Sequence, residues 1–67
     1  NKGGNAPAVL NAANEVAVER FLRDELTFTG MTDAIEHALE MVDWEAQPDL
    51  ESLIASDTAA RAATREF

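Results

Sequence analysis

The residues best able to do chemistry in this chain are one histidine and the carboxylates around it. His37 follows Glu36 directly, and Asp33 and Glu40 lie about one helical turn before and after it. These groups could bind a metal ion together. Their spacing, however, matches neither the Glu-x-x-His pairs of di-iron bundles nor the two-histidine helix of zinc proteases. The pattern therefore favours an exposed histidine in an acidic patch.

No nucleophile or phosphate-binding loop stands out elsewhere in the sequence. Ser52 and Ser56 lack a histidine in any suggestive context, and Ser56 is better placed as a helix cap. The Gly3-Gly4 pair is not followed by Gly-Lys-Ser/Thr and does not belong to a dinucleotide-binding fingerprint. We therefore assign no catalytic, cofactor-binding or metal-binding residue, and no cofactor, to this segment.

Two asparagines lie in a predicted helix from 8 to 23, which begins near Pro7 and has Asn5 as its candidate cap. At about 100° per residue, Asn14 falls at the centre of the apolar face of this helix and Asn11 at its edge. Buried amides are costly unless they are hydrogen-bonded. They could contact a ligand, or they could tie the helix to a neighbouring element. We favour internal ties, because buried amide networks specify packing more often than chemistry. The apolar members of the predicted face are Leu10, Ala13, Ala17, Val18 and Phe21.

A second helix is predicted from 31 to 42, after an extended connector at 26–29 whose apolar side chains cover the edge of the core. Thr29 or Thr32 is its candidate cap. Trp44 then follows as a lid over the end of the helix, and its indole N–H needs a partner if it is covered. The apolar stripe of this helix is the clearest in the chain: Met31, Ala34, Ile35, Ala38, Leu39 and Val42.

The C-terminal third predicts one short helix and one longer helix. Pro48 ends the preceding segment. Ser56 or Asp57 is the candidate cap of the last helix, whose alanine-rich stripe buries little area. The short helix is indicated by the spacing of Leu50, Leu53 and Ile54. The predicted fold class is all-α, a small bundle of three main helices plus one short helix.

Composition limits the classes of function. The chain has 67 residues, no cysteine and a net charge of −8, which disfavours nucleic acid and anionic membranes as partners. It has no apolar run long enough to span a membrane and no signal peptide, and the lack of cysteine fits the cytoplasmic location that we expect. Because it opens at Asn1 without an initiator methionine and stops within a helical pattern, we expect a segment of a longer protein. The apolar stripes of the first two helices predict that the isolated chain self-associates as a dimer.

One string is specific enough to indicate a family. The run from Gly3 to Leu22, GGNAPAVLNAANEVAVERFL, resembles the C-terminal domain of 1-deoxy-D-xylulose 5-phosphate reductoisomerase. The connector from Leu26 to Met31 is also similar to that family, and the tail is similar in outline. The resemblance implies that residues 1–67 are a fragment of a four-helix-type C-terminal domain in a multidomain homodimer. It further implies that the parent enzyme reduces its rearranged substrate with NADPH and a divalent cation, Mg or Mn, on the route to isoprenoid precursors.

The resemblance places no active-site residue in this segment. The leading hypothesis is therefore a non-catalytic domain that braces the catalytic domain of an NADPH-dependent reductoisomerase, with the remaining domains of that enzyme as its partners. The alternative is a free-standing acidic helical module for protein interaction. An encoded length of about 400 residues favours the first hypothesis, and a reading frame of the present length favours the second.

Overall fold

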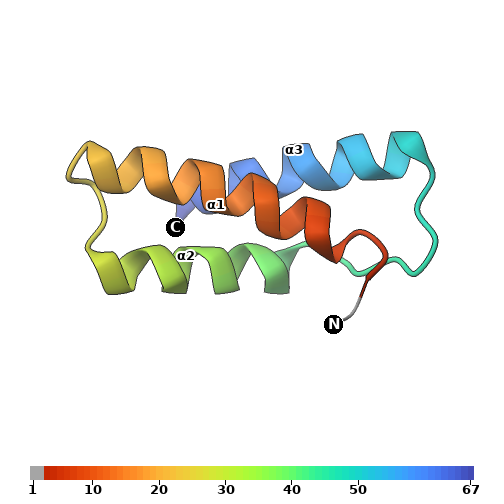
Figure 1. The fold of residues 1–67 in the computed structure, drawn as a ribbon, viewed down its shortest axis with the longest axis horizontal. Helices are drawn as coiled ribbons and strands as arrows, with labels where there is room; N and C mark the ends of the chain where they lie inside the picture. Colours follow the sequence, from red (N-terminus) through yellow and green to blue (C-terminus); the bar gives the residue numbers. More distant parts are fainter. Residues whose placement is uncertain (1–2) are drawn as a thin grey trace.

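The computed structural model describes residues 3–67 and contains three helices (Figure 1). They are α1 (Ala6–Leu22), α2 (Phe28–Met41) and α3 (Leu50–Glu66). The chain reverses direction between consecutive helices, so α1 and α3 run parallel to each other and antiparallel to α2. Each helix contacts the other two. The all-α prediction is confirmed, and no strand occurs among the described residues.

Small side chains form the core. Nine apolar positions form it, two valines and seven alanines drawn from all three helices, together with the polar residues Asn5, Ser56 and Thr64. Short side chains at the contacts allow the helix axes to approach closely, because interaxial distance depends on the residues between them. The core has two clusters of buried apolar residues. Val42 packs against the cluster that contains Val9, and Ile35 packs against the cluster that contains Ala13. The buried apolar residues are Val9, Ala12, Ala13, Val16, Ala17, Ala34, Ala38, Ala60 and Ala63.

The buried face of α1 is rotated by about one residue from the predicted one: Ala13 and Ala17 are buried as predicted, but the larger apolar members of the predicted face are not. Val9 and Val16 are buried, whereas Leu10 is 49% exposed and Phe21 is 38% exposed. The prediction weighted leucine and phenylalanine above alanine. The helix instead turns its smaller residues toward two close neighbours, because large side chains would hold the helices apart. Its bulkiest apolar side chains therefore lie at the surface.

α2 begins three residues earlier than predicted. The side chain of Thr27 caps it by accepting a hydrogen bond of 3.0 Å from the amide of Gly30, so neither Thr29 nor Thr32 is the cap. The predicted extended connector is also wrong, because Phe28 belongs to the first turn of α2 and is 76% exposed. Its ring meets Phe21 edge-on, with 6.3 Å between centroids. The predicted stripe holds in part: Ala34 and Ala38 are buried, Met31, Ile35 and Val42 are half-buried, and Leu39 is exposed.

α3 is a single continuous helix, so the predicted short helix and the break at Ser56 are wrong. Asp49 is the cap, and its side chain accepts a hydrogen bond of 2.8 Å from the amide of Ser52. An aspartate after Pro48 starts a helix efficiently, and nothing between 50 and 66 interrupts one. Ser56 lies inside α3 and is buried, with its hydroxyl bonded to Asn5. Among the described residues, no helix is long and apolar enough to cross a membrane.

Candidate functional site

Asn5 is the polar centre of the structure and is only 1% exposed. Its Nδ2 donates to the carbonyl oxygen of Asp43 at 2.8 Å and to Oγ of Ser56 at 3.1 Å. Its Oδ1 accepts from the amide of Glu45 at 2.8 Å, and its own amide donates to the carbonyl of Glu45 at 3.0 Å. Asn5 occupies the N-cap position of α1, as predicted, but its side chain makes no cap hydrogen bond to the helix. Asn5 instead joins the start of α1 to the α2–α3 loop and to α3.

Two residues beside Asn5 complete this junction, which we call the clasp (Gly3–Asn5 with 43–45). Gly4 has φ +59°, and a Cβ there would overlap the carbonyl oxygen of Glu45. Only glycine fits a left-handed conformation with such a close backbone approach. The indole Nε1 of Trp44 donates to the carbonyl of Gly3 at 3.1 Å. Trp44 thus lies beyond the end of α2, and its N–H has a partner although the side chain is 44% exposed.

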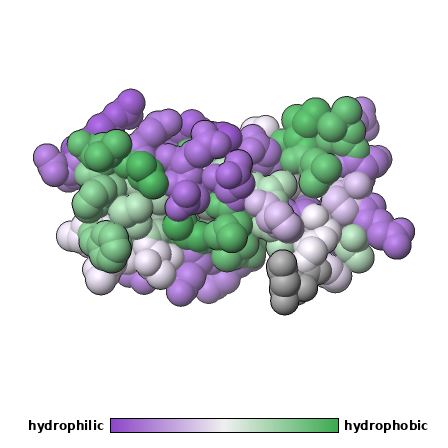
Figure 2. All heavy atoms as spheres, in the orientation of Figure 1, coloured by the Kyte–Doolittle hydropathy of each residue, from purple (hydrophilic) through white to green (hydrophobic). Residues whose placement is uncertain are grey.

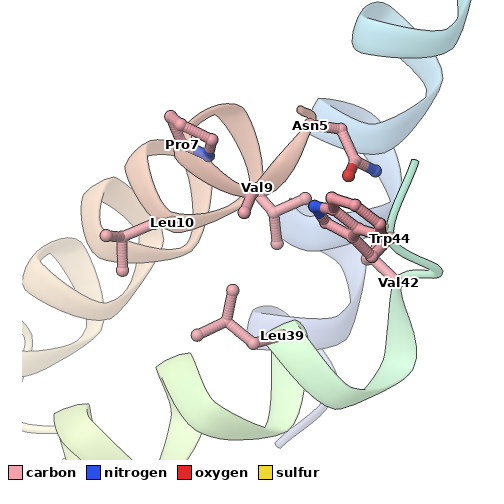
Figure 3. Close-up of a pocket in the computed structure, with 8 residues that line it drawn as sticks. Asn5, Pro7, Val9, Leu10, Leu39, Val42 and Trp44 are labelled. Atoms are coloured by element: carbon pink, nitrogen blue, oxygen red, sulfur yellow. The ribbon is translucent and has the colours of Figure 1, made fainter. Parts of the chain in front are cut away.

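An apolar cleft lies next to the clasp, between α1 and α2 (Figure 3). Its volume is about 440 Å³. Pro7 and Leu10 approach it from α1, Leu39 from α2, and Val42 and Trp44 from the segment that follows α2. None of its lining residues is charged.

The cleft belongs to a longer apolar face of α1 and α2, which we define by Leu10, Phe21, Phe28, Leu39 and Trp44. Eleven residues span three helical turns, so Leu10 and Phe21 share one side of α1, and Phe28 and Leu39 share one side of α2. All five side chains are between 38% and 76% exposed. Figure 2 shows hydrophobic side chains in separate patches on the surface that faces the viewer, at the end where α1 leads into α2, near the middle, and over the start of α3, with hydrophilic side chains between them. A large exposed patch of apolar residues is typical of a surface that binds another protein.

Asn11 and Asn14 are not internal ties of the bundle. Both are exposed, because the helix is rotated away from the predicted face. Asn11 Nδ2 lies 3.5 Å from Oε2 of Glu15, at the limit of a hydrogen bond. Asn14 makes no side-chain hydrogen bond within residues 3–67. The amide that the fold does bury, Asn5, was missed because its partners lie 38 to 51 residues away in the sequence.

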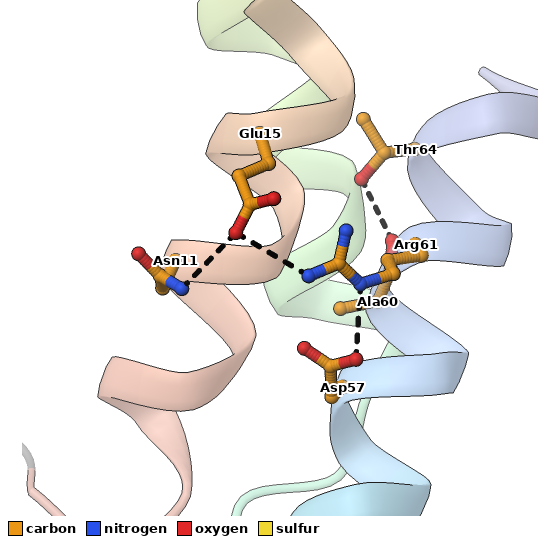
Figure 4. A network of polar contacts seen from close by, with 6 residues as sticks. All are labelled: Asn11, Glu15, Asp57, Ala60, Arg61 and Thr64. Carbon is orange, nitrogen blue, oxygen red and sulfur yellow. Dashed lines mark hydrogen bonds and ion pairs between the residues drawn. The ribbon is translucent and has the colours of Figure 1, made fainter.

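A surface network joins α1 to α3 near Asn11 (Figure 4). Arg61 donates from Nε to Asp57 at 2.9 Å and from Nη2 to Glu15 at 3.4 Å. Hydrogen bonding to Asp57, and then to Glu15, raises the pKa of the Arg61 guanidinium, which keeps it charged. Exposed pairs of this kind contribute little to stability. The network links the surfaces of α1 and α3. It contains no nucleophilic side chain beside a base that could activate it.

The acidic residues around His37 line a shallow cleft closed at one side by Phe67. The imidazole ring of His37 is half-buried and packs on the ring of Phe67, with 5.5 Å between centroids. No group of three or more histidine, cysteine, aspartate or glutamate residues in the described part of the chain could hold a metal ion. His37 therefore has a packing contact in this fold.

Comparison with known proteins assigns the chain to a family. Residues 1–63 match the family model described as the DXP reductoisomerase C-terminal domain. The chain is 48% identical over 66 residues to the 1-deoxy-D-xylulose 5-phosphate reductoisomerase of Bacteroides fragilis, covering 98% of the chain and 17% of that relative. It is 51% identical over 67 residues to the enzyme of the same name from Nitrosomonas eutropha, covering 100% of the chain and 16% of the relative. It is 50% identical over 64 residues to the enzyme of the same name from Symbiobacterium thermophilum, covering 96% of the chain and 16% of that relative. The chain thus spans about a sixth of the curated relatives that it matches, and it belongs to the family of DXP reductoisomerase C-terminal domains.

Proposed function

We propose that residues 1–67 are a non-catalytic structural domain of a 1-deoxy-D-xylulose 5-phosphate reductoisomerase, an enzyme of isoprenoid biosynthesis, and that they brace its catalytic part. Family membership supports this proposal, together with the small share of each relative that the chain spans. The observation that carries it is the exposed apolar face of α1 and α2. A domain of this size gains little by leaving five large apolar side chains in water unless another surface covers them.

The parent enzyme would take its chemistry from elsewhere in its chain. The family resemblance implies NADPH as the hydride donor and a divalent cation, Mg or Mn. The described residues offer no cluster of metal ligands, and no basic side chain lines the cleft beside Trp44 to pair with a dinucleotide's phosphates. We therefore derive no catalytic step through this segment.

The partners of this domain would be the remaining domains of the same enzyme, within a homodimer located in the cytoplasm. The charge of −8 supports a protein partner over nucleic acid or an anionic membrane. The alternative, a free-standing interaction module, is not favoured, because relatives at about 50% identity carry the same segment within a far longer enzyme.

Activity assays test this proposal. The purified 67-residue chain should not oxidise NADPH when it is given 1-deoxy-D-xylulose 5-phosphate and Mg, whereas the intact parent protein should do so under the same conditions. Turnover by the chain alone would refute the non-catalytic role. An intact parent without this activity would refute the assignment to a reductoisomerase.

A further inference from the structure

Two adjacent glycines lie where the chain enters the bundle, and such a pair is typical of a flexible linker. Both instead have a defined left-handed conformation, with φ of +68° at Gly3 and +59° at Gly4. The carbonyl oxygen of Gly3 accepts two hydrogen bonds of 3.1 Å, one from the amide of Ala6 and one from the indole Nε1 of Trp44. Rotation of this peptide group would break at least one of the two bonds, because both depend on its direction. The glycine pair is therefore a fixed part of the clasp.

The residue after the glycines fastens the entering chain to the α2–α3 loop. The amide of Asn5 donates to the carbonyl of Glu45 at 3.0 Å, and the amide of Glu45 donates back to Oδ1 of Asn5 at 2.8 Å. The Nδ2 group of Asn5 is used as well, by Asp43 and Ser56. Asn5 is 1% exposed, and hydrogen bonds that are shielded from water are stronger than exposed ones. Residues 3–5 are thus held by partners 38 to 51 positions further along the chain.

We propose that the clasp is a rigid joint that fixes how the catalytic part of the parent enzyme is attached to this domain, and that Gly4 and Asn5 are positioning residues for its reaction. The inference rests on the proposed function. The matched family model describes a C-terminal domain, so the catalytic part joins this domain on its N-terminal side, next to the clasp. A domain braces another only through a stiff connection, because domains on a flexible linker move independently. A displacement of about 1 Å at a reacting group, even from a distant change, can cost about a hundredfold in rate.

Amide hydrogen exchange in the intact parent protein measures whether the joint is rigid. The amides of Asn5 and Glu45 each donate to the other residue, so exchange of both requires the clasp to open. We expect both amides to exchange roughly a hundredfold or more slowly than in the unfolded chain. Slowing of less than about tenfold would show that residues 3–5 are a flexible linker and would overturn the inference.

Alanine exchanges at the two glycines test the positioning role. Gly3→Ala and Gly4→Ala add the same methyl group at adjacent residues with positive φ, but only at Gly4 does it overlap the carbonyl oxygen of Glu45. The intact parent is assayed at a temperature where circular dichroism shows both variants to be folded. The kcat for NADPH oxidation should fall by about tenfold or more for Gly4→Ala and by less than about twofold for Gly3→Ala. The loss should appear in kcat and not in the KM for substrate, since on the proposed function this domain does not bind substrate. Equal kcat values for the two variants would overturn the inference.

A second pair of variants replaces the first if Gly4→Ala does not fold. Trp44→Phe and Ser56→Ala each remove one hydrogen bond of 3.1 Å, but only the bond from Trp44 holds Gly3. The kcat should fall by about threefold or more for Trp44→Phe and stay within about twofold for Ser56→Ala, although both lose stability. Equal kcat values would again overturn the inference. An unchanged parent that does not oxidise NADPH would instead refute the proposed function, so the two failures are distinguishable.

Discussion

Replacing Asn5 by alanine is expected to destabilise this chain more than any other exchange of asparagine for alanine. The substitution removes three side-chain hydrogen bonds, to Asp43, Glu45 and Ser56, from a residue that is 1% exposed. At about 1 kcal/mol for each bond, the loss is about 3 kcal/mol, and any partner left dry adds to it. A chain of this length has a total stability of about 3 to 10 kcal/mol. A single amide therefore accounts for a large fraction of the folding free energy.

Thermal unfolding followed by circular dichroism measures this effect. A loss of about 3 kcal/mol lowers the Tm of a domain this small by about 12 to 24 °C. Asn14→Ala is the matched control, since Asn14 lies exposed on α1 and alanine is the better helix former, so its Tm should stay the same or rise slightly. Ser56→Ala removes one of the three bonds and should give roughly a third of the loss. Equal Tm values for Asn5→Ala and Asn14→Ala would refute the role of the clasp.

Three further outcomes are expected. Gly4→Ala should unfold at a markedly lower temperature than Gly3→Ala in parallel melts, because both glycines have positive φ but only at Gly4 would a Cβ overlap the Glu45 carbonyl; equal melting temperatures would contradict this. The amide of Ser52 holds the pKa of Asp49 below its usual 3.8, so the charged cap stabilises the fold above that pH and the benefit disappears as pH falls through the lowered value. Asp49→Asn keeps a side-chain oxygen that can accept the Ser52 hydrogen bond but removes the charge. The Tm of the native chain should therefore exceed that of Asp49→Asn by less as the pH is lowered, and a difference that grows on acidification would contradict the lowered pKa. The isolated chain should dimerise more strongly as salt screens its charge of −8, as measured by sedimentation equilibrium, and dissociation by salt would show that the apolar face does not drive association.

The fold class could be predicted from the sequence because helical periodicity and caps are local signals. Pro7 marked the start of α1 and Pro48 the approach to α3, and the alanines of α2 pointed to its buried side. The continuous α3 was missed because Ser56 has the chemistry of a cap. Its hydroxyl has a distant partner instead, which no local pattern reveals.

The orientation of α1 could not be predicted, for a physical reason. A helix in contact with two neighbours selects the face that packs most closely, and in this chain that face carries alanines and valines, with leucine and phenylalanine left outside. The same error misplaced Asn14 in the core. The combination of large exposed apolar residues with a small-residue core supports the proposal that another surface covers this face, and it emerges only once the three helices are assembled.

The size of the native polypeptide that carries this sequence tests the central claim most directly. An antibody raised against the 67-residue chain should detect, in an extract of the source cells separated under denaturing conditions, one polypeptide far larger than the 7.3 kDa of the chain, as its relatives require. A native polypeptide of about 7.3 kDa would contradict the proposal that this chain is a domain of a reductoisomerase and would favour the alternative of a free-standing interaction module.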